Sequence, residues 1–405
     1  NYRVRLLVRD LAPLAFQRLT VDPTTENNHA ACPGESEVTQ AVLENKHLRV
    51  SINQTGRMDL YDKRTKAFHP DVMRLEDEAD TGTLYEFAGH SAPPWSSASC
   101  TPTLAFLVDT PLLQKCRITY QLPLPAEFDA TLQDRSRQTL INPIAIELAL
   151  SKGSELVELT FTIENRSKDH RLRVEFTTGI HTLLSVASAP FDAVVRNKLH
   201  DLDGQHNNDH PTSDFVDISD GQRGLAVLTE GVHEFNHLKG GYGKLAFTLV
   251  RAVKGFGDYN DQCADAQCLR TLSRRLDWVS DAGSYADAQI PAKALRFANK
   301  VLALAENVDP KTFVRGRPVV QDSSIQETFY PLDKHAGLYI PAGPSFIRID
   351  NPRIQVTAFK QAQQGQAHII RLYNPCPDNE KITISFFPRA ARVFACSMEE
   401  ICSQE

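Results

Sequence analysis

Apolar and polar residues alternate along most of this sequence in short segments that end at Gly, Pro, Asn or Asp. A two-residue period of this kind is typical of half-buried β-strands. Helical periodicity is scarce, and only the Ala- and Leu-rich segment 292–306 is expected to be helical, from residue propensity. The pattern therefore predicts an all-β protein.

The clearest predicted hairpin joins the alternating segments 157–163 and 172–176. Their apolar residues all face one way, and the charged and Thr residues between them face the other way. Residues 165–170 are polar and are expected to form the turn between the two strands.

Two further hairpins are expected. Residues 48–52 are predicted to pair with 58–60, with Gly56 supplying the positive φ that a tight turn often needs. Residues 369–373 are predicted to pair with 382–386 across a turn that contains two prolines, which exclude a continuing central strand.

Two polar stretches divide the chain. Residues 22–37 are rich in turn formers, and residues 307–345 carry several prolines and glycines. We therefore expect residues 1–37 to close a preceding small β-domain and its linker. Residues 38–306 would form the main domain, and residues 307–405 a linker and a C-terminal β-sandwich.

Composition and charge argue against several classes of partner and compartment. The 405 residues carry a net charge of −6, and their Lys and Arg are dispersed, which argues against nucleic acid or an anionic membrane as a partner. No apolar run approaches the roughly 18 residues of a membrane span. The eight cysteines are sparse and lack a disulfide-framework spacing, which favours a reducing cytoplasm. The chain opens inside a strand-like run at Tyr2, which suggests a fragment.

Six segments carry a family resemblance. In chain order they are Leu43–Val50, Leu75–Phe87, Asn165–Val174, Leu245–Val253, Ala266–Leu269 and Ile370–Pro375. Several are ordinary strand sequences in isolation, but together and in this order they resemble the C-terminal β region of family 38 glycoside hydrolases. The resemblance is to the bacterial α-mannosidase and mannosylglycerate hydrolase branch.

The resemblance implies a galactose-mutarotase-like β-supersandwich flanked by smaller β-sandwich modules. It implies a retaining α-mannosidase-type enzyme acting on α-mannosides or (phospho)mannosylglycerate. In this family the zinc ion, the nucleophilic aspartate and the acid that protonates the leaving oxygen belong to an N-terminal α/β domain. That domain is not recognisable in this chain, so no catalytic residue and no metal ligand is assigned here. The chain alone would be inactive, with the catalytic domain as its partner and a homo-oligomer possible in principle.

One loop of this chain is expected to reach the sugar. By resemblance, Tyr85 falls where the family places a tyrosine that lines the sugar subsite, where it could stack on a pyranose or donate its hydroxyl. Asp80 matches the bacterial pattern, and Gly82 permits a sharp turn. The alternative is an acidic loop that carries a half-buried strand tyrosine. The loop departs from the family pattern at three positions, Ala79, Thr83 and Leu84.

Other candidate sites have simpler explanations. The His- and Asp-rich segment 200–210 matches no zinc or calcium spacing and is interpreted as a surface loop. Four residues separate Cys263 from Cys268, which matches neither the redox Cys-x-x-Cys motif nor half of a zinc site, so two separate thiols are expected. Gly240–Lys244 is interpreted as a hairpin turn. Arg251 lies in an apolar strand, where a structural ion pair is the first interpretation and a role beside a site the second.

Two other functions stay open. The chain could be a stand-alone carbohydrate-binding or structural β-sandwich protein. It could also be a mutarotase-like or lyase enzyme, which would need a catalytic His and Glu pair, and no such pair can be assigned.

Overall fold

The computed structural model describes residues 35–90, 94–199, 209–238, 243–256, 259–299, 346–386, 390 and 392–402. The chain divides into two compact units, one of residues 29–298 and one that combines 1–28 with 299–405. The predicted strand near Tyr2 and the linker 307–345 lie outside the described residues, and the predicted domain boundaries stay predictions.

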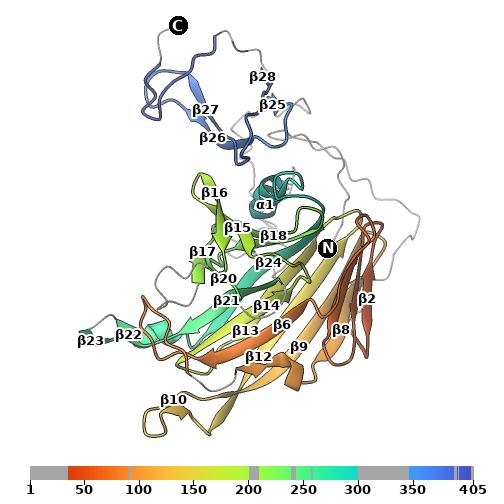
Figure 1. Cartoon of the computed structure of the whole chain (residues 1–405), viewed down its shortest axis with the longest axis vertical. Coiled ribbons are helices and arrows are strands. Elements are labelled where there is room, and N and C mark those ends of the chain that lie inside the picture. The colour runs from red at the N-terminus through yellow and green to blue at the C-terminus, as the bar shows by residue number, and fades with distance from the viewer. Residues whose placement is uncertain are drawn as a thin grey trace, which may run out of the picture. The chain divides into compact units, whose positions relative to one another are not determined.

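The larger unit contains three main antiparallel sheets (Figure 1). The ten-stranded sheet has the order β1 (Ser36–Val38), β8 (Thr103–Asp109), β9 (Leu113–Pro125), β12 (Thr139–Ser151), β13 (Val157–Glu164), β24 (Thr271–Asp281), β19 (Gly224–Glu230), β18 (Phe215–Ser219), β15 (Leu184–Ala189) and β16 (Asp192–Asn197). The six-stranded sheet has the order β17 (Asp209–Pro211), β20 (Glu234–His237), β21 (Lys244–Ala252), β14 (His170–Thr177), β6 (Met73–Ala79) and β7 (Trp95–Ser96).

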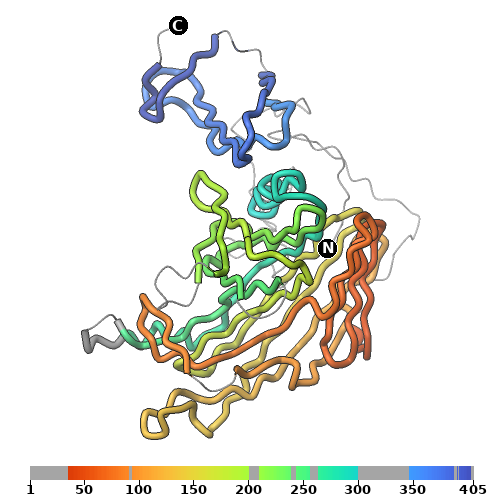
Figure 2. Tube along the Cα trace, in the orientation of Figure 1, coloured from red at the N-terminus to blue at the C-terminus, as the bar shows by residue number. Residues whose placement is uncertain are grey.

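A four-stranded meander and short elements complete this unit. The meander consists of β2 (Ala41–Glu44), β3 (Leu48–Ile52), β4 (Met58–Asp62) and β5 (Ala67–His69). The short elements are the strand pairs β10 (Phe128–Asp129) with β11 (Asp134–Arg135) and β22 (Gly255–Phe256) with β23 (Tyr259–Gln262), and the 3-10 turns Ser97–Ser99 and Ala264–Gln267. Strand β2 contacts β8 and β9, so this end of the meander lies beside the ten-stranded sheet (Figure 2).

One apolar core joins these sheets. Alternate residues of each strand point inward, as the exposed and buried positions of β3 and β12 show. Phe176 of the six-stranded sheet meets Trp278 of the ten-stranded sheet edge to face, with ring centroids 5.7 Å apart. Both side chains are fully buried. The predicted all-β fold class, with a large β-supersandwich, is confirmed.

The predicted hairpin of residues 48–60 is also confirmed. Strands β3 and β4 pair with Ile52 opposite Met58. Gly56 has φ +78°, the left-handed region that an L-residue rarely adopts. A Cβ there would lie 2.3 Å from the hydroxyl oxygen of Tyr120, so the turn also needs glycine for space.

The predicted hairpin of residues 157–176 is wrong. Strand β13 pairs with β12 and β24, whereas β14 pairs with β6 and β21 in the opposite sheet. Residues 165–169 therefore cross between the sheets, and Asn165 is buried there rather than exposed in a turn. Its amide nitrogen donates hydrogen bonds to the carbonyl oxygens of Gln267 (3.0 Å) and Cys268 (3.2 Å). Two strands with matching apolar faces can pair edge to edge or face each other across a core, and alternation alone does not distinguish these arrangements.

The hairpin predicted near the C-terminal end is wrong for a similar reason. Strand β27 (His368–Tyr373) pairs with β26 (Gln355–Gln361), and β28 (Ile384–Phe386) pairs with β25 (Ile347–Ile349). Strands β27 and β28 are where the sequence predicts them, but each pairs with an earlier strand and not with the other.

Helix α1 (Ile290–Ala298) confirms the predicted helix 292–306 as far as residue 298, and the prediction from residue 300 lies outside the described residues. Its buried residues pack on the outer face of the ten-stranded sheet, against Phe215, Leu228 and Val279. An amphipathic helix thus covers apolar side chains that the main core does not reach.

Candidate functional site

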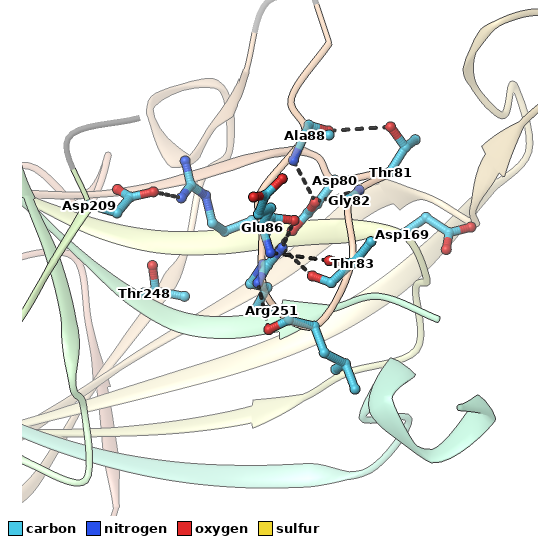
Figure 3. A network of polar contacts seen from close by, with 12 residues as sticks. Asp80, Thr81, Gly82, Thr83, Glu86, Ala88, Asp169, Asp209, Thr248 and Arg251 are labelled. Atoms are coloured by element: carbon cyan, nitrogen blue, oxygen red, sulfur yellow. Dashed lines mark hydrogen bonds and ion pairs between the residues drawn. The ribbon is translucent and has the colours of Figure 1, made fainter. Parts of the chain in front are cut away.

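The loop that follows β6 is organised around Asp80, which is completely buried. One carboxylate oxygen, Oδ1, accepts hydrogen bonds from the backbone N–H of Gly82 (2.9 Å) and of Ala88 (3.2 Å). The other, Oδ2, pairs with Nε of Arg251 at 2.7 Å (Figure 3). Both oxygens of this candidate residue are thus occupied inside the protein.

Arg251 of β21 fastens the same loop at further points. Its Nη2 donates to the carbonyl oxygen of Thr83 at 2.6 Å and also to that of Glu86. The structural ion pair expected for Arg251 is confirmed, with Asp80 as its partner. A guanidinium presents several donors in one rigid plane, so a single side chain can hold a carboxylate and two carbonyls together.

Gly82 is required for space rather than for a left-handed backbone. A Cβ at this position would lie 2.0 Å from the carbonyl oxygen of Glu86 and 2.7 Å from the backbone nitrogen of Ala88. Its φ does not lie in the positive region, so the sharp turn expected from the sequence relies on the missing side chain rather than on a left-handed backbone. The two arms of the loop approach each other too closely for any side chain.

Tyr85 lies at the tip of this loop and is 71% exposed. Its backbone N–H donates to Oγ1 of Thr83 at 3.1 Å, and the N–H of Leu84 donates to the carbonyl oxygen of Gly255 at 2.9 Å. The alternative of a half-buried strand tyrosine is wrong, because the residue lies outside the strands and is mostly exposed. Its contact with a sugar stays a prediction.

An arginine beside the loop escaped the sequence reasoning. The guanidinium carbon of Arg171 lies 3.4 Å from the centroid of the Phe87 ring. Arg171 also forms ion pairs with Glu78 (2.9 Å) and Asp209 (2.6 Å), although it is almost fully buried. The sequence does show a charged residue inside an alternating strand. It does not show the partners of that charge, because Glu78 and Asp209 come from distant segments. Through these contacts Arg171 connects the loop to β6 and β17, and Figure 3 shows Asp209 in the same group of polar contacts as the loop residues.

A second group of carboxylates lies elsewhere, on the face covered by α1. Asp217 is fully buried. Its burial, and to a smaller extent the charge of the nearby Asp281, raises the pKa of its carboxyl well above the ordinary value. Burial likewise raises the pKa of Asp281 to about 7. A glycosidase pair must flank a bound sugar, and these two carboxyls are shielded from any ligand of that size.

The described residues contain no group of three or more His, Cys, Asp or Glu that could hold a metal ion. The family resemblance places the zinc site in an N-terminal domain, and no chemical step is assigned to zinc in this chain. Within the same residues, no helix is both long and apolar enough to cross a membrane. The segment 200–208, the main part of the His- and Asp-rich candidate, and most of Gly240–Lys244 lie outside the described residues.

Known structures share this fold. An α-mannosidase from Enterococcus faecalis V583 superposes with a TM-score of 0.75 and 20% identity over 89% of this chain and 40% of that one. A family 38 glycosyl hydrolase from Enterococcus faecalis gives a TM-score of 0.72 with 19% identity, covering 89% of this chain and 42% of that one.

Sequence comparison agrees. A protein of Halalkalibacterium halodurans, provisionally named a mannosylglycerate hydrolase, is 24% identical over 84% of this chain. The chain spans 37% of the length of that curated relative. The family model described as the C-terminal domain of glycosyl hydrolases family 38 matches residues 43–255, more than half of the chain. The chain therefore belongs to glycosyl hydrolase family 38, whose C-terminal domain it contains.

Proposed function

We propose that the chain is the C-terminal β region of a retaining α-mannosidase-type glycoside hydrolase. Its substrate would be an α-mannoside or (phospho)mannosylglycerate, and its nucleophile and zinc site would lie in an N-terminal domain outside these 405 residues. Family membership supports the glycosidase class. The names of the relatives, an α-mannosidase and a provisional mannosylglycerate hydrolase, support a substrate that contains mannose. We also propose the cytoplasm as its compartment.

Within this enzyme we assign residues 80–88 to one wall of the sugar subsite. The observation that carries the assignment is the buried clamp between Asp80 and Arg251, which holds a loop whose tip exposes Tyr85. Two charges taken out of water are costly, and they stay together only with good geometry and further hydrogen bonds. A loop held in this way presents its tyrosine in a defined position, and a tyrosine can stack on a sugar ring or donate its hydroxyl. Asp80 and Gly82 would position Tyr85 rather than contact the sugar.

The test uses the complete gene product, assayed with p-nitrophenyl α-mannoside and with mannosylglycerate. Removing the hydroxyl with Tyr85→Phe is expected to lower kcat/KM about tenfold, the effect of one hydrogen bond of roughly 1.4 kcal/mol. Tyr85→Ala is expected to lower it further. Tyr61→Phe, on strand β4 of the meander, is the matched control and should leave the kinetics unchanged. Wild-type kinetics in both Tyr85 variants would refute the sugar-facing assignment.

The reading frame of the gene tests the enzyme proposal itself. A His- and Asp-rich α/β domain encoded before Asn1, with zinc bound by the intact protein, would support it. Its absence would favour the second candidate, a stand-alone carbohydrate-binding protein, which the exposed aromatic ring of Tyr85 also suits. Binding of the 405-residue chain to immobilised mannosides, lost in Tyr85→Ala, would support that candidate.

A further inference from the structure

Two exposed cysteines face each other near the C-terminal end of the chain. Cys396 and Cys402 occupy opposite positions of an isolated antiparallel bridge. The N–H of Ser397 donates to the carbonyl oxygen of Ile401 at 2.9 Å. This hydrogen bond joins the residue after Cys396 to the residue before Cys402, and not the two cysteines themselves. The cysteines thus form a non-hydrogen-bonded pair.

This geometry suits a covalent link. In such a pair the Cα atoms lie about 4.5 Å apart and both side chains project from the same face. A disulfide needs Cα atoms roughly 4.4–6.8 Å apart. The backbone therefore brings the two residues into range without movement. Cys116, by contrast, is fully buried, where a thiol is shielded from reagents.

The turn between the cysteines is already attached to the neighbouring hairpin. Oε2 of Glu400 accepts a hydrogen bond from the backbone N–H of Gln363 at 2.7 Å, and its other carboxylate oxygen pairs with Lys360 of β26. Glu400 itself has φ +63°, so the turn is tight. A disulfide between Cys396 and Cys402 would therefore close a covalent ring on a turn that is already attached to the hairpin.

We propose that Cys396 and Cys402 form a reversible intramolecular disulfide with a low-molecular-weight disulfide, such as oxidised glutathione, as the oxidant. One cysteine thiolate attacks the glutathione disulfide, forms a mixed disulfide and releases one glutathione thiol. The second cysteine thiolate attacks the sulfur of the first cysteine and releases the other glutathione. Two protein thiols are oxidised to one disulfide, and their two protons are carried by the two released glutathione thiols.

The test treats the folded 405-residue chain with oxidised glutathione, blocks remaining thiols with iodoacetamide and digests the protein with trypsin. Arg392 is followed by no further Lys or Arg, so residues 393–405 leave as one peptide that contains both cysteines. We expect this peptide unalkylated and two hydrogen atoms lighter than the dithiol form, with dithiothreitol restoring two alkylation sites. Cys376→Ser, in the same unit, should leave this result unchanged.

Cys402→Ser separates the proposal from ordinary thiol exposure. Cys396 of that variant should stop at the mixed disulfide and carry one glutathione. A wild-type peptide that carries two alkyl groups or two glutathiones after oxidation would overturn the proposal. A disulfide-linked dimer on a non-reducing gel that is lost in Cys402→Ser would overturn it as well.

Discussion

Replacing Arg251 by Met tests whether the candidate loop depends on its buried clamp. Methionine keeps most of the length of the side chain but removes the guanidinium. Asp80 would then remain fully buried with only two backbone N–H donors. The carbonyl oxygen of Thr83 would lose the guanidinium donor, and that of Glu86 would keep only the backbone N–H of Thr83.

The expected cost follows from burial. The side chains of Asp80 and Arg251 are 0% and 17% exposed, so this is a pair largely removed from water. Removing one partner of a buried pair costs about 3–5 kcal/mol. Water can reach the exposed side of the loop and replace part of what is lost, so we expect about 3 kcal/mol, which is roughly a hundredfold change in an opening equilibrium.

Native-state hydrogen exchange measures this locally. The N–H groups of Thr81 and Thr83 donate across the loop to the carbonyl oxygens of Ala88 (2.9 Å) and Glu86 (2.8 Å), so they report its opening. Their protection factors should fall about a hundredfold in Arg251→Met. Strands β12 and β13 should keep their protection.

A matched control and a second variant make the result decisive. Arg166 pairs with Glu164 at 2.6 Å, but their side chains are 48% and 45% exposed, so Arg166→Met should cost less than about 1 kcal/mol. Adding Asp80→Asn to Arg251→Met should recover part of the loss, because it removes the uncompensated charge. If Arg251→Met changed loop protection no more than Arg166→Met, the clamp would not hold the loop.

Three further predictions address the loop, the core and the buried acids. Gly82→Ala forces a methyl group against backbone atoms 2.0 and 2.7 Å away and should destabilise the loop by about 1–3 kcal/mol, measured by the same exchange experiment. Phe176→Ala leaves a cavity beside Trp278 and should lower the free energy of unfolding of the larger unit by about 3–5 kcal/mol in urea titrations; a change below about 1 kcal/mol would contradict the packing. Burial raises the pKa of Asp281 from 3.8 to about 7, so the folded state holds a proton that the unfolded state releases, and stability is lost as the pH rises from about 4 through 7. Asp281→Asn should flatten this part of the pH-stability curve, and an unchanged slope would contradict the raised pKa.

The sequence by itself determined the all-β class, the positions of β3, β4, β13, β14, β27 and β28, and the tight turn at Gly56. These features follow from local chemistry, because a two-residue period places one face of a strand in the core and a positive φ selects glycine. The sequence also indicated the family, because several segments that resemble it occur in the same order, and one of them contains the loop around Tyr85. Arg251 was recognisable as a paired charge because an isolated cation in an apolar strand is costly.

Only the tertiary structure decided which strands are neighbours and which charges meet. Strands β13 and β14 look like a hairpin in the sequence but lie in opposite sheets, since an apolar face can be buried equally well by either arrangement. Asp80 and Arg251 are far apart in the chain, and pairing depends on the register of β6, β14 and β21, which no local pattern encodes. That pair also fastens the loop that carries Tyr85. Strand identity is thus a local property, whereas the loop with its candidate function is a product of sheet register.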